Sequence, residues 1–224
     1  MDELCLKYMK YYQVWSHRKL LLLFPSTFPS SSVSNSLATV IPTPSQELTY
    51  LSRILAMDAK NYHTWAYRQW LLTHYGDTHP GLWEQELIAT DILIEDDVRN
   101  NSAWHHRFFI CFASGAQSDV QERELAFVKS KISFAPNNLS AWNYLRGILD
   151  KSNTHYVELR QFVELYCAPR VGRAGKEEEV EVYDLDNPRP SSTADLPCSL
   201  AIEFLADLCE QEGENEKAIE VCIS

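Results

Sequence analysis

A phrase centred on tryptophan recurs four times in the sequence and constrains the fold more than any other feature. The tryptophans are Trp15, Trp65, Trp104 and Trp142, at intervals of 50, 39 and 38 residues. Each follows a tyrosine or asparagine by four residues and, in three of the four copies, precedes an arginine by three. These positions share one face of an α-helix, and a period in the high thirties is typical of arrays of helical hairpins.

The flanking residues predict how each hairpin is built. Asn61, Asn100 and Asn138 stand four residues before their tryptophans, where an asparagine side chain can cap a helix. The arginine one turn after the tryptophan can reach an acidic or carbonyl partner in the next repeat. A second helix with apolar residues at helical spacing is predicted before three of the phrases, in residues 45–58, 82–97 and 120–134. Such hairpins bury their apolar faces only by stacking, so we predict an all-α fold, an α-α superhelix of stacked helical hairpins.

The pattern predicts one helical-repeat domain over residues 1–224. Its repeats are expected at about 1–24, 45–75, 82–113, 120–150 and 198–224. The last is expected to be a degenerate hairpin whose second helix is cut short. Only about nine residues precede the first tryptophan helix, which predicts an array shortened at its N-terminus. The connecting segments 25–44, rich in Ser, Thr and Pro, and 169–197, acidic and then rich in Pro and Ser, are predicted to be disordered.

Composition excludes several classes of function. The net charge of −11 argues against nucleic-acid binding, which needs a basic face. The longest apolar run, 20–24, is far shorter than a membrane helix, and the acidic N-terminus has no apolar signal core, so we predict a cytoplasmic protein without stable membrane insertion. The six cysteines and seven histidines show no ligand spacing, and no metal site is predicted on this chain.

The repeated phrases resemble the protein prenyltransferase alpha-subunit repeat, a helix with the pattern Asn-x-x-x-Trp-x-x-Arg. Residues 57–72, 95–109 and 136–149 look like the alpha subunit shared by protein farnesyltransferase and protein geranylgeranyltransferase type I. Residues 10–21 are similar to the family phrase KNYQVWHHR. The alpha subunit of the Rab-specific geranylgeranyltransferase shares the repeat but looks less like the flanking residues.

The resemblance implies a subunit of a heterodimeric enzyme that is inactive alone. In that family the alpha subunit wraps around a beta subunit, which holds a catalytic Zn²⁺ and most of the isoprenoid pocket. The enzyme transfers a farnesyl or geranylgeranyl group from its diphosphate to a cysteine thiol in the C-terminal CaaX box of a protein substrate. Mg²⁺ is implied for the farnesyl reaction, and no cofactor is expected on this chain itself.

The resemblance also assigns roles to individual residues. Lys10 matches the catalytic lysine that meets the isoprenoid diphosphate, and an ammonium is a compact charge suited to a negative leaving group. Tyr12 matches a tyrosine at the mouth of the active site, and Gln13 matches the glutamine that binds the CaaX carboxylate. The family's Asn-Tyr-His motif, whose tyrosine lies near the diphosphate, is matched in the next repeat by the substrate-binding candidates Asn61, Tyr62 and His63.

A second hypothesis from another class is a non-catalytic helical-repeat scaffold or an inactive truncated relative. Tyr11 departs from the family pattern, since it stands where the other copies have asparagine, and this weakens the predicted helix cap beside Lys10. The discriminating feature is the segment Lys10–Gln13, because a scaffold gains nothing by keeping Lys10, Tyr12 and Gln13 together at a helix start.

Overall fold

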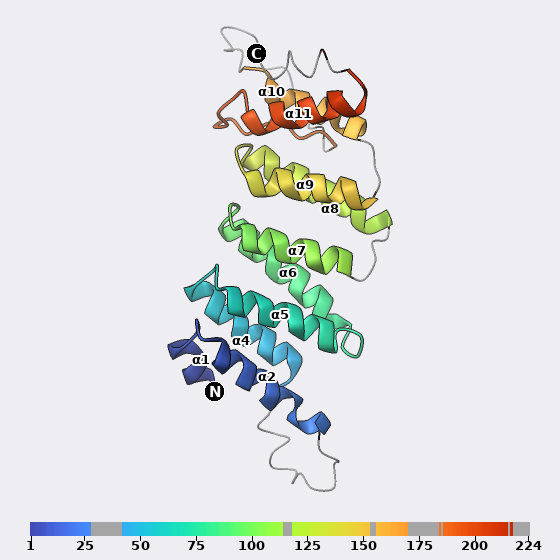
Figure 1. The fold of residues 1–224 in the computed structure, drawn as a ribbon. Coiled ribbons are helices and arrows are strands. Elements are labelled where there is room, and N and C mark those ends of the chain that lie inside the picture. Colours follow the sequence, from blue (N-terminus) through green and yellow to red (C-terminus); the bar gives the residue numbers. More distant parts are fainter. Residues whose placement is uncertain are drawn as a thin grey trace. The chain divides into compact units, whose positions relative to one another are not determined.

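The structure, a computed structural model, describes residues 1–27, 42–113, 118–152, 156–169, 184, 186–214 and 216 (Figure 1). Its regular elements in these ranges are helices, with no strand among them. In chain order they are α1 (Asp2–Lys7), α2 (Tyr12–Thr27), α4 (Pro44–Met57), α5 (Tyr62–Tyr75), α6 (Gly81–Asp96), α7 (Asn101–Ala113), α8 (Ser118–Phe134), α9 (Leu139–Ser152), η1 (Tyr156–Leu159), α10 (Arg160–Cys167) and α11 (Ser199–Gln211). The predicted all-α class of helical hairpins is confirmed.

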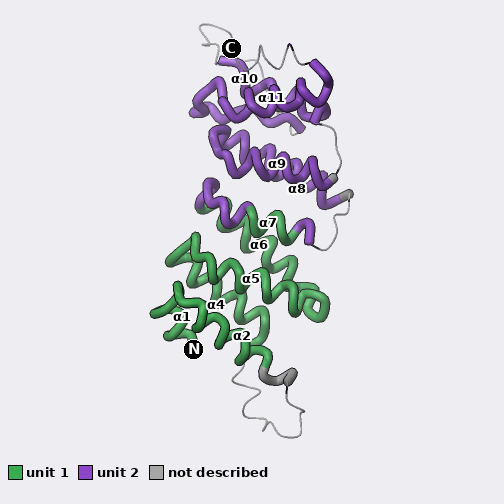
Figure 2. Tube along the Cα trace, viewed as in Figure 1, with its two compact units in different colours: residues 1–96, 105–110 green, residues 97–104, 111–224 purple. Residues whose placement is uncertain are grey.

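The chain divides into two compact units (Figure 2). Unit 1 comprises Met1–Asp96 and His105–Ile110, and unit 2 comprises Asp97–Trp104 and Cys111–Ser224. In unit 1, α1 packs against α2, α2 against α5, and α4 against both α5 and α6. In unit 2, α8 packs against α9 and α10 against α11. None of the described helices has both the length and the apolar character that crossing a bilayer would need.

Each repeat tryptophan forms a hydrogen bond to the turn between the two helices of its hairpin. Its indole nitrogen donates a hydrogen bond to the carbonyl group six residues earlier, and the acceptors are Met9, Ala59, Val98 and Pro136 at 2.8, 3.0, 2.8 and 2.7 Å. The four rings are also buried. Each tryptophan therefore supplies both core packing and the only polar group that a buried indole has to satisfy.

Asparagine caps the later tryptophan helices as predicted. Asn61 Oδ1 accepts from the backbone N–H of Thr64 at 3.1 Å. Asn100 and Asn138 likewise accept from the N–H two residues further on, at 3.1 and 3.2 Å. These bonds satisfy backbone donors that the first turn of a helix leaves free.

The C-terminal part of unit 2 differs from the sequence prediction. The predicted last hairpin begins with α11, and residues 217–224, where its second helix was expected, lie outside the described residues. Helix α11 packs against α10, a helix before it that the sequence did not predict. Trp142 contacts rings from both helices of this hairpin, with centroid distances of 6.3 Å to Phe162 and 5.6 Å to Phe204. Helix α10 has only eight residues and follows the last copy of the tryptophan phrase, so the recurring pattern does not predict it.

The predicted disorder of the two connecting segments is partly wrong. Residues 25–27 belong to α2, and most of the rest of the first segment lies outside the described residues. In the second segment, residues 186–197 lie against α8 and α10, where the carbonyl groups of Asp186 and Pro188 accept from Lys129 and Tyr166 at 2.8 and 2.6 Å. A chain rich in Pro and Ser is ordered here because donors on other helices satisfy its carbonyl groups. Residues 170–183 lie outside the described residues.

Candidate functional site

The predicted site residues lie on two neighbouring turns of unit 1. The turn between α1 and α2 carries Lys10, and the turn between α4 and α5 carries Asn61. Asn61 Nδ2 donates to the carbonyl of Met9 at 3.5 Å, and His63 Nε2 donates to the carbonyl of Lys10 at 3.1 Å. Segments about 50 residues apart in sequence are thereby joined at the N-terminal ends of two helices.

The side chains at this edge are free to meet a ligand. Tyr12 and Tyr62 expose 64% and 76% of their surface, and Lys10 and Gln13 are also exposed. Among the described residues the Lys10 ammonium has no hydrogen-bond or ion-pair partner. Exposed tyrosines and an exposed lysine, carried at the starts of two helices whose preceding turns are in contact, form a surface suited to an anionic ligand with an apolar portion.

Asn61 is engaged differently from the other candidates. Its side chain is 4% exposed, and Oδ1 accepts from the N–H and the hydroxyl of Thr64, both at 3.1 Å. Nδ2 donates to Asp58 at 3.2 Å in addition to the longer contact with Met9. All four hydrogen-bonding positions of the amide are occupied within the chain. The structure therefore assigns Asn61 to holding the two turns, and it leaves no group of this side chain for substrate.

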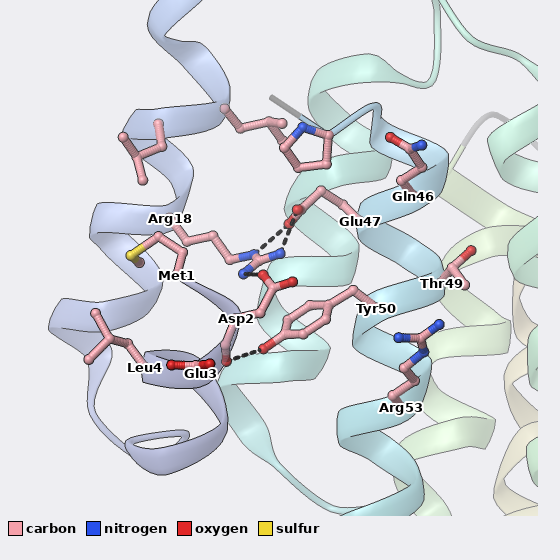
Figure 3. Close-up of a pocket in the computed structure, with 13 residues that line it drawn as sticks. Met1, Asp2, Glu3, Leu4, Arg18, Gln46, Glu47, Thr49, Tyr50 and Arg53 are labelled. Carbon is pink, nitrogen blue, oxygen red and sulfur yellow. Dashed lines mark hydrogen bonds and ion pairs between the residues drawn. The ribbon is translucent and has the colours of Figure 1, made fainter. Parts of the chain in front are cut away.

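Buried ion pairs link the hairpins of unit 1. Arg18 donates to both carboxylate oxygens of Glu47 at 2.6 Å, and its third nitrogen donates to Asp2 at 2.7 Å (Figure 3). The guanidinium lies 4.1 Å from the ring centroid of Tyr50. The arginine one turn after Trp15 thus reaches a carboxylate in the next hairpin, as the sequence predicted, and the two-pronged geometry favours arginine over lysine.

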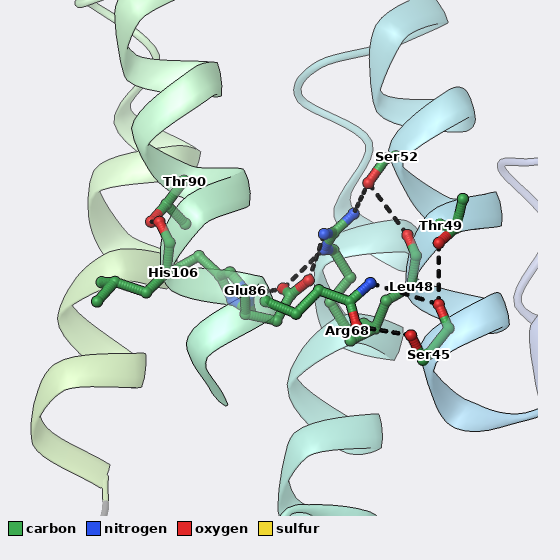
Figure 4. A network of polar contacts seen from close by, with 10 residues as sticks. Ser45, Leu48, Thr49, Ser52, Arg68, Glu86, Thr90 and His106 are labelled. Atoms are coloured by element: carbon green, nitrogen blue, oxygen red, sulfur yellow. Dashed lines mark hydrogen bonds and ion pairs between the residues drawn. The ribbon is translucent and has the colours of Figure 1, made fainter. Parts of the chain in front are cut away.

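The equivalent pair one hairpin later includes a buried histidine (Figure 4). Arg68 donates to both carboxylate oxygens of Glu86, and its third nitrogen donates to the hydroxyl of Ser52 at 3.0 Å. His106 Nε2 donates to Glu86 at 2.7 Å, while the buried His106 Nδ1 has no hydrogen-bond partner among the described residues. Burial alone would raise the pKa of Glu86, but Arg68 and His106 outweigh burial and lower it to about 2. Burial is the main cause that lowers the pKa of His106.

The sequence carries a signal for these buried carboxylates. A Glu-Leu pair recurs in the first helix of three hairpins at Glu47, Glu86 and Glu124, with the same 39- and 38-residue intervals as the later tryptophans. All three glutamates are buried. A carboxylate repeated on the apolar face of a helix indicates a buried partner, because an isolated charge is costly to bury.

We expect the stability of the protein to fall as the pH is lowered from 7 to 5, in part because of His106. Burial lowers the pKa of His106 in the folded chain below its ordinary value of about 6.5, so the unfolded chain takes up this proton at a higher pH than the folded chain does. Stability therefore rises with pH through this range, by at most about 1.4 kcal/mol per pH unit for one proton. A further loss of stability comes from protonation of Glu86. It begins as the pH falls below the ordinary pKa of 4.5 and is complete near pH 2.

The matched control for this prediction is His106→Gln, whose amide nitrogen can still donate to Glu86. Urea unfolding of both proteins between pH 5 and 7.5 measures the difference in unfolding free energy. The wild-type protein should lose stability relative to the variant as the pH falls. A difference that stays constant over this range contradicts the lowered pKa of His106.

A separate pocket of unit 1 does not include any predicted site residue. It has a volume of about 1090 Å³ and lies between α1, α2 and α4 (Figure 3). Of its charged lining groups, Arg18 is already paired with Glu47 and Asp2, and Glu3 and Arg53 complete the charged lining. No group of three His, Cys, Asp or Glu side chains within the described ranges is arranged to hold a metal ion.

The tandem hairpins, with capping asparagines, turn-binding tryptophans and buried arginine–glutamate pairs, define a helical-repeat protein. A family model described as the protein prenyltransferase alpha subunit repeat matches residues 1–24, 44–75, 83–114 and 122–152, which is more than half of the chain. The chain belongs to the protein prenyltransferase alpha subunit family.

Curated relatives of two types are similar to this chain. The geranylgeranyl transferase type-2 subunit alpha of Saccharomyces cerevisiae is 28% identical over 67% of this chain and 43% of its own length. The mouse protein of the same name is 32% identical over 69% of this chain and 26% of its own length. The protein farnesyltransferase/geranylgeranyltransferase type-1 subunit alpha of Pisum sativum is 38% identical over 38% of this chain and 26% of its own length.

A solved structure supports the same fold. A chain of Candida albicans protein geranylgeranyltransferase-I complexed with GGPP matches all of this chain and 64% of its own length, with 28% sequence identity and a TM-score of 0.73. The present chain thus spans less than half of the curated relatives described above and less than two thirds of this structural neighbour.

Proposed function

We propose that the chain is the alpha subunit of a heterodimeric CaaX protein prenyltransferase. In this proposal it helps to transfer a farnesyl or geranylgeranyl group from its diphosphate to a cysteine thiol of a protein substrate. The observation that carries the proposal is the junction of two turns, where His63 donates to the carbonyl of Lys10 and leaves Lys10, Tyr12, Gln13 and Tyr62 exposed at one edge of unit 1.

The chemistry of the transfer explains why these groups are suited to it. Cleavage of the bond between the prenyl carbon and the diphosphate oxygen leaves negative charge on the diphosphate. The Lys10 ammonium, which has no ion-pair partner in the described part of the chain, can stabilise that charge. The N-terminal ends of α2 and α5 add partial positive charge at the same edge, and the Tyr62 hydroxyl is exposed for donation to a phosphate oxygen.

The remaining parts of the proposal concern groups outside this chain. The beta subunit would supply the Zn²⁺ and most of the isoprenoid pocket, and Mg²⁺ would assist the farnesyl reaction. A cytoplasmic location likewise stays a prediction. This chain's own contribution is to hold Lys10 and Tyr62 at the diphosphate, Tyr12 at the mouth of the active site and Gln13 at the peptide carboxylate.

A second candidate function is the alpha subunit of a geranylgeranyl transferase of type 2. The observation that favours it is the longer similarity to type-2 relatives, which extends over 67% and 69% of this chain, against 38% for the type-1 relative from Pisum sativum. The scaffold hypothesis is also consistent with the repeats, but it predicts no role for Lys10 in prenyl transfer.

Co-expression with the beta subunits of the organism's prenyltransferases separates these functions. We expect co-purification with a beta subunit shared by CaaX enzymes, and transfer of a labelled prenyl group to a CaaX peptide. Co-purification only with the type-2 beta subunit, and transfer only to a Rab protein, would establish the second candidate. A complex without transfer to either substrate, or no complex, favours the scaffold.

We expect Gln13→Ala to raise the KM for a CaaX peptide about tenfold, with less than about a threefold loss of kcat. A carboxylate contact is made in both the ground state and the transition state, so its loss weakens binding more than it slows the reaction. Steady-state kinetics of the heterodimer measure this split. Ser16→Ala, on the same helix and also exposed, is the control and should change neither constant. An unchanged KM would remove Gln13 from the site.

A further inference from the structure

The turn that carries Lys10 is held by three side chains. Trp15 Nε1 donates to the carbonyl of Met9 at 2.8 Å, and Asn61 Nδ2 donates to the same oxygen at 3.5 Å. His63 Nε2 donates to the next carbonyl, that of Lys10, at 3.1 Å. Because the peptide group is planar, fixing two consecutive carbonyl groups also fixes the direction in which the Lys10 side chain leaves the backbone.

Two of these three contacts are general features of the repeat. In unit 2, Trp104 Nε1 and Asn138 Nδ2 both donate to the carbonyl of Val98, at 2.8 and 2.6 Å. The contact of His63 is an addition to this pattern. The position two residues before the tryptophan is Ser140 in α9, and its short hydroxyl makes no hydrogen bond to a preceding turn within the described residues.

The chemistry of the contact defines what His63 must supply. A carbonyl oxygen only accepts, so His63 Nε2 carries the hydrogen, in the neutral tautomer or in the imidazolium. The ring is half-buried, and it forms a T-shaped pair with the Tyr62 ring at a centroid distance of 5.5 Å. A donor at the Nε2 position is therefore required, whereas a positive charge is not.

We propose that His63 is a positioning residue, which aims the Lys10 ammonium at the diphosphate through the Lys10 carbonyl and does not itself contact substrate. This inference rests on the proposed function, since it needs Lys10 to act in the transfer. It replaces the role of substrate-binding residue that the resemblance implied for His63. The closing experiments therefore separate an error about His63 from an error about Lys10.

Two substitutions that differ by one methylene group test the need for a donor. The amide nitrogen of His63→Gln can occupy the place of Nε2, whereas that of His63→Asn is one bond short and falls near Nδ1. In single-turnover reactions of the heterodimer with saturating substrates, we expect His63→Asn and His63→Ala to be about three- to tenfold slower than wild type. His63→Gln should stay within about twofold of wild type. A His63→Gln variant as slow as His63→Ala overturns the proposal.

A double-mutant cycle tests whether His63 acts through Lys10. In a Lys10→Ala background, His63→Ala should change the single-turnover rate by less than about twofold, since no ammonium remains to be aimed. The same several-fold loss in both backgrounds overturns the inference about His63 and leaves the proposed function standing. A Lys10→Ala variant with the wild-type rate overturns both. Thermal unfolding of each variant reports folding, and if His63→Ala does not fold, the Gln and Asn variants alone decide.

Discussion

Replacement of Lys10 by alanine in the heterodimer is expected to slow prenyl transfer on the order of tenfold to a thousandfold. One charge stabiliser at a developing oxyanion is typically worth up to about 3–4 kcal/mol. The lower half of this range is expected, because the proposed beta subunit would hold most of the isoprenoid pocket and would supply further groups to the diphosphate. Single-turnover kinetics with a labelled isoprenoid diphosphate measure the chemical step, and the KM for the peptide should change little.

Lys7→Ala is the matched control for this result. Lys7 is the last residue of α1 and is also exposed, and its ammonium lies over the ring of Tyr8 at 5.3 Å from the centroid. The Lys7→Ala substitution removes the same positive charge as Lys10→Ala, and it does so close to the same turn. A general effect of net charge would therefore slow both variants alike. We expect Lys7→Ala to stay within about twofold of wild type, since surface charges act weakly over distance in salt. Equal losses in the two variants would remove the specific role of Lys10.

Replacement of Trp104 by alanine is expected to lower the free energy of unfolding by about 3–5 kcal/mol. The ring is 2% exposed and packs against Phe127 and Tyr144, with centroid distances of 5.7 and 5.1 Å. Urea unfolding followed by circular dichroism measures the loss. A change this large approaches the whole stability of many domains, so the variant will be only partly folded at 37 °C.

Trp104→Phe separates the two roles of the indole. It keeps most of the buried ring and removes the N–H that donates to the carbonyl of Val98. That oxygen also accepts from Asn138, so the lost hydrogen bond should cost only about 1 kcal/mol. If Trp104→Ala unfolds at the same urea concentration as wild type while the heterodimer loses activity, Trp104 belongs to the chemistry and not to the packing.

Local periodicity predicted the helices that carry the family phrase. Helix α5 begins at Tyr62, directly after its capping Asn61, and α9 begins at Leu139, directly after Asn138. The period of the tryptophans also predicted the fold class and the approximate bounds of four hairpins. The same reasoning missed α10, which is short and lies outside the recurrent phrase. It also assigned disorder to residues 186–197, whose composition favours no regular element.

The sequence by itself determined which residues share a helix face and which could cap a helix, because helix geometry converts spacing along the chain into position on a surface. Only the tertiary structure decided which turns meet. It joined the turn of Lys10 to the start of α5 across about 50 residues, occupied every polar group of Asn61 within the chain, and placed His106 beside Glu86. Such contacts depend on how successive hairpins pack, and a repeat length alone does not specify which side-chain atoms that packing brings within hydrogen-bonding distance.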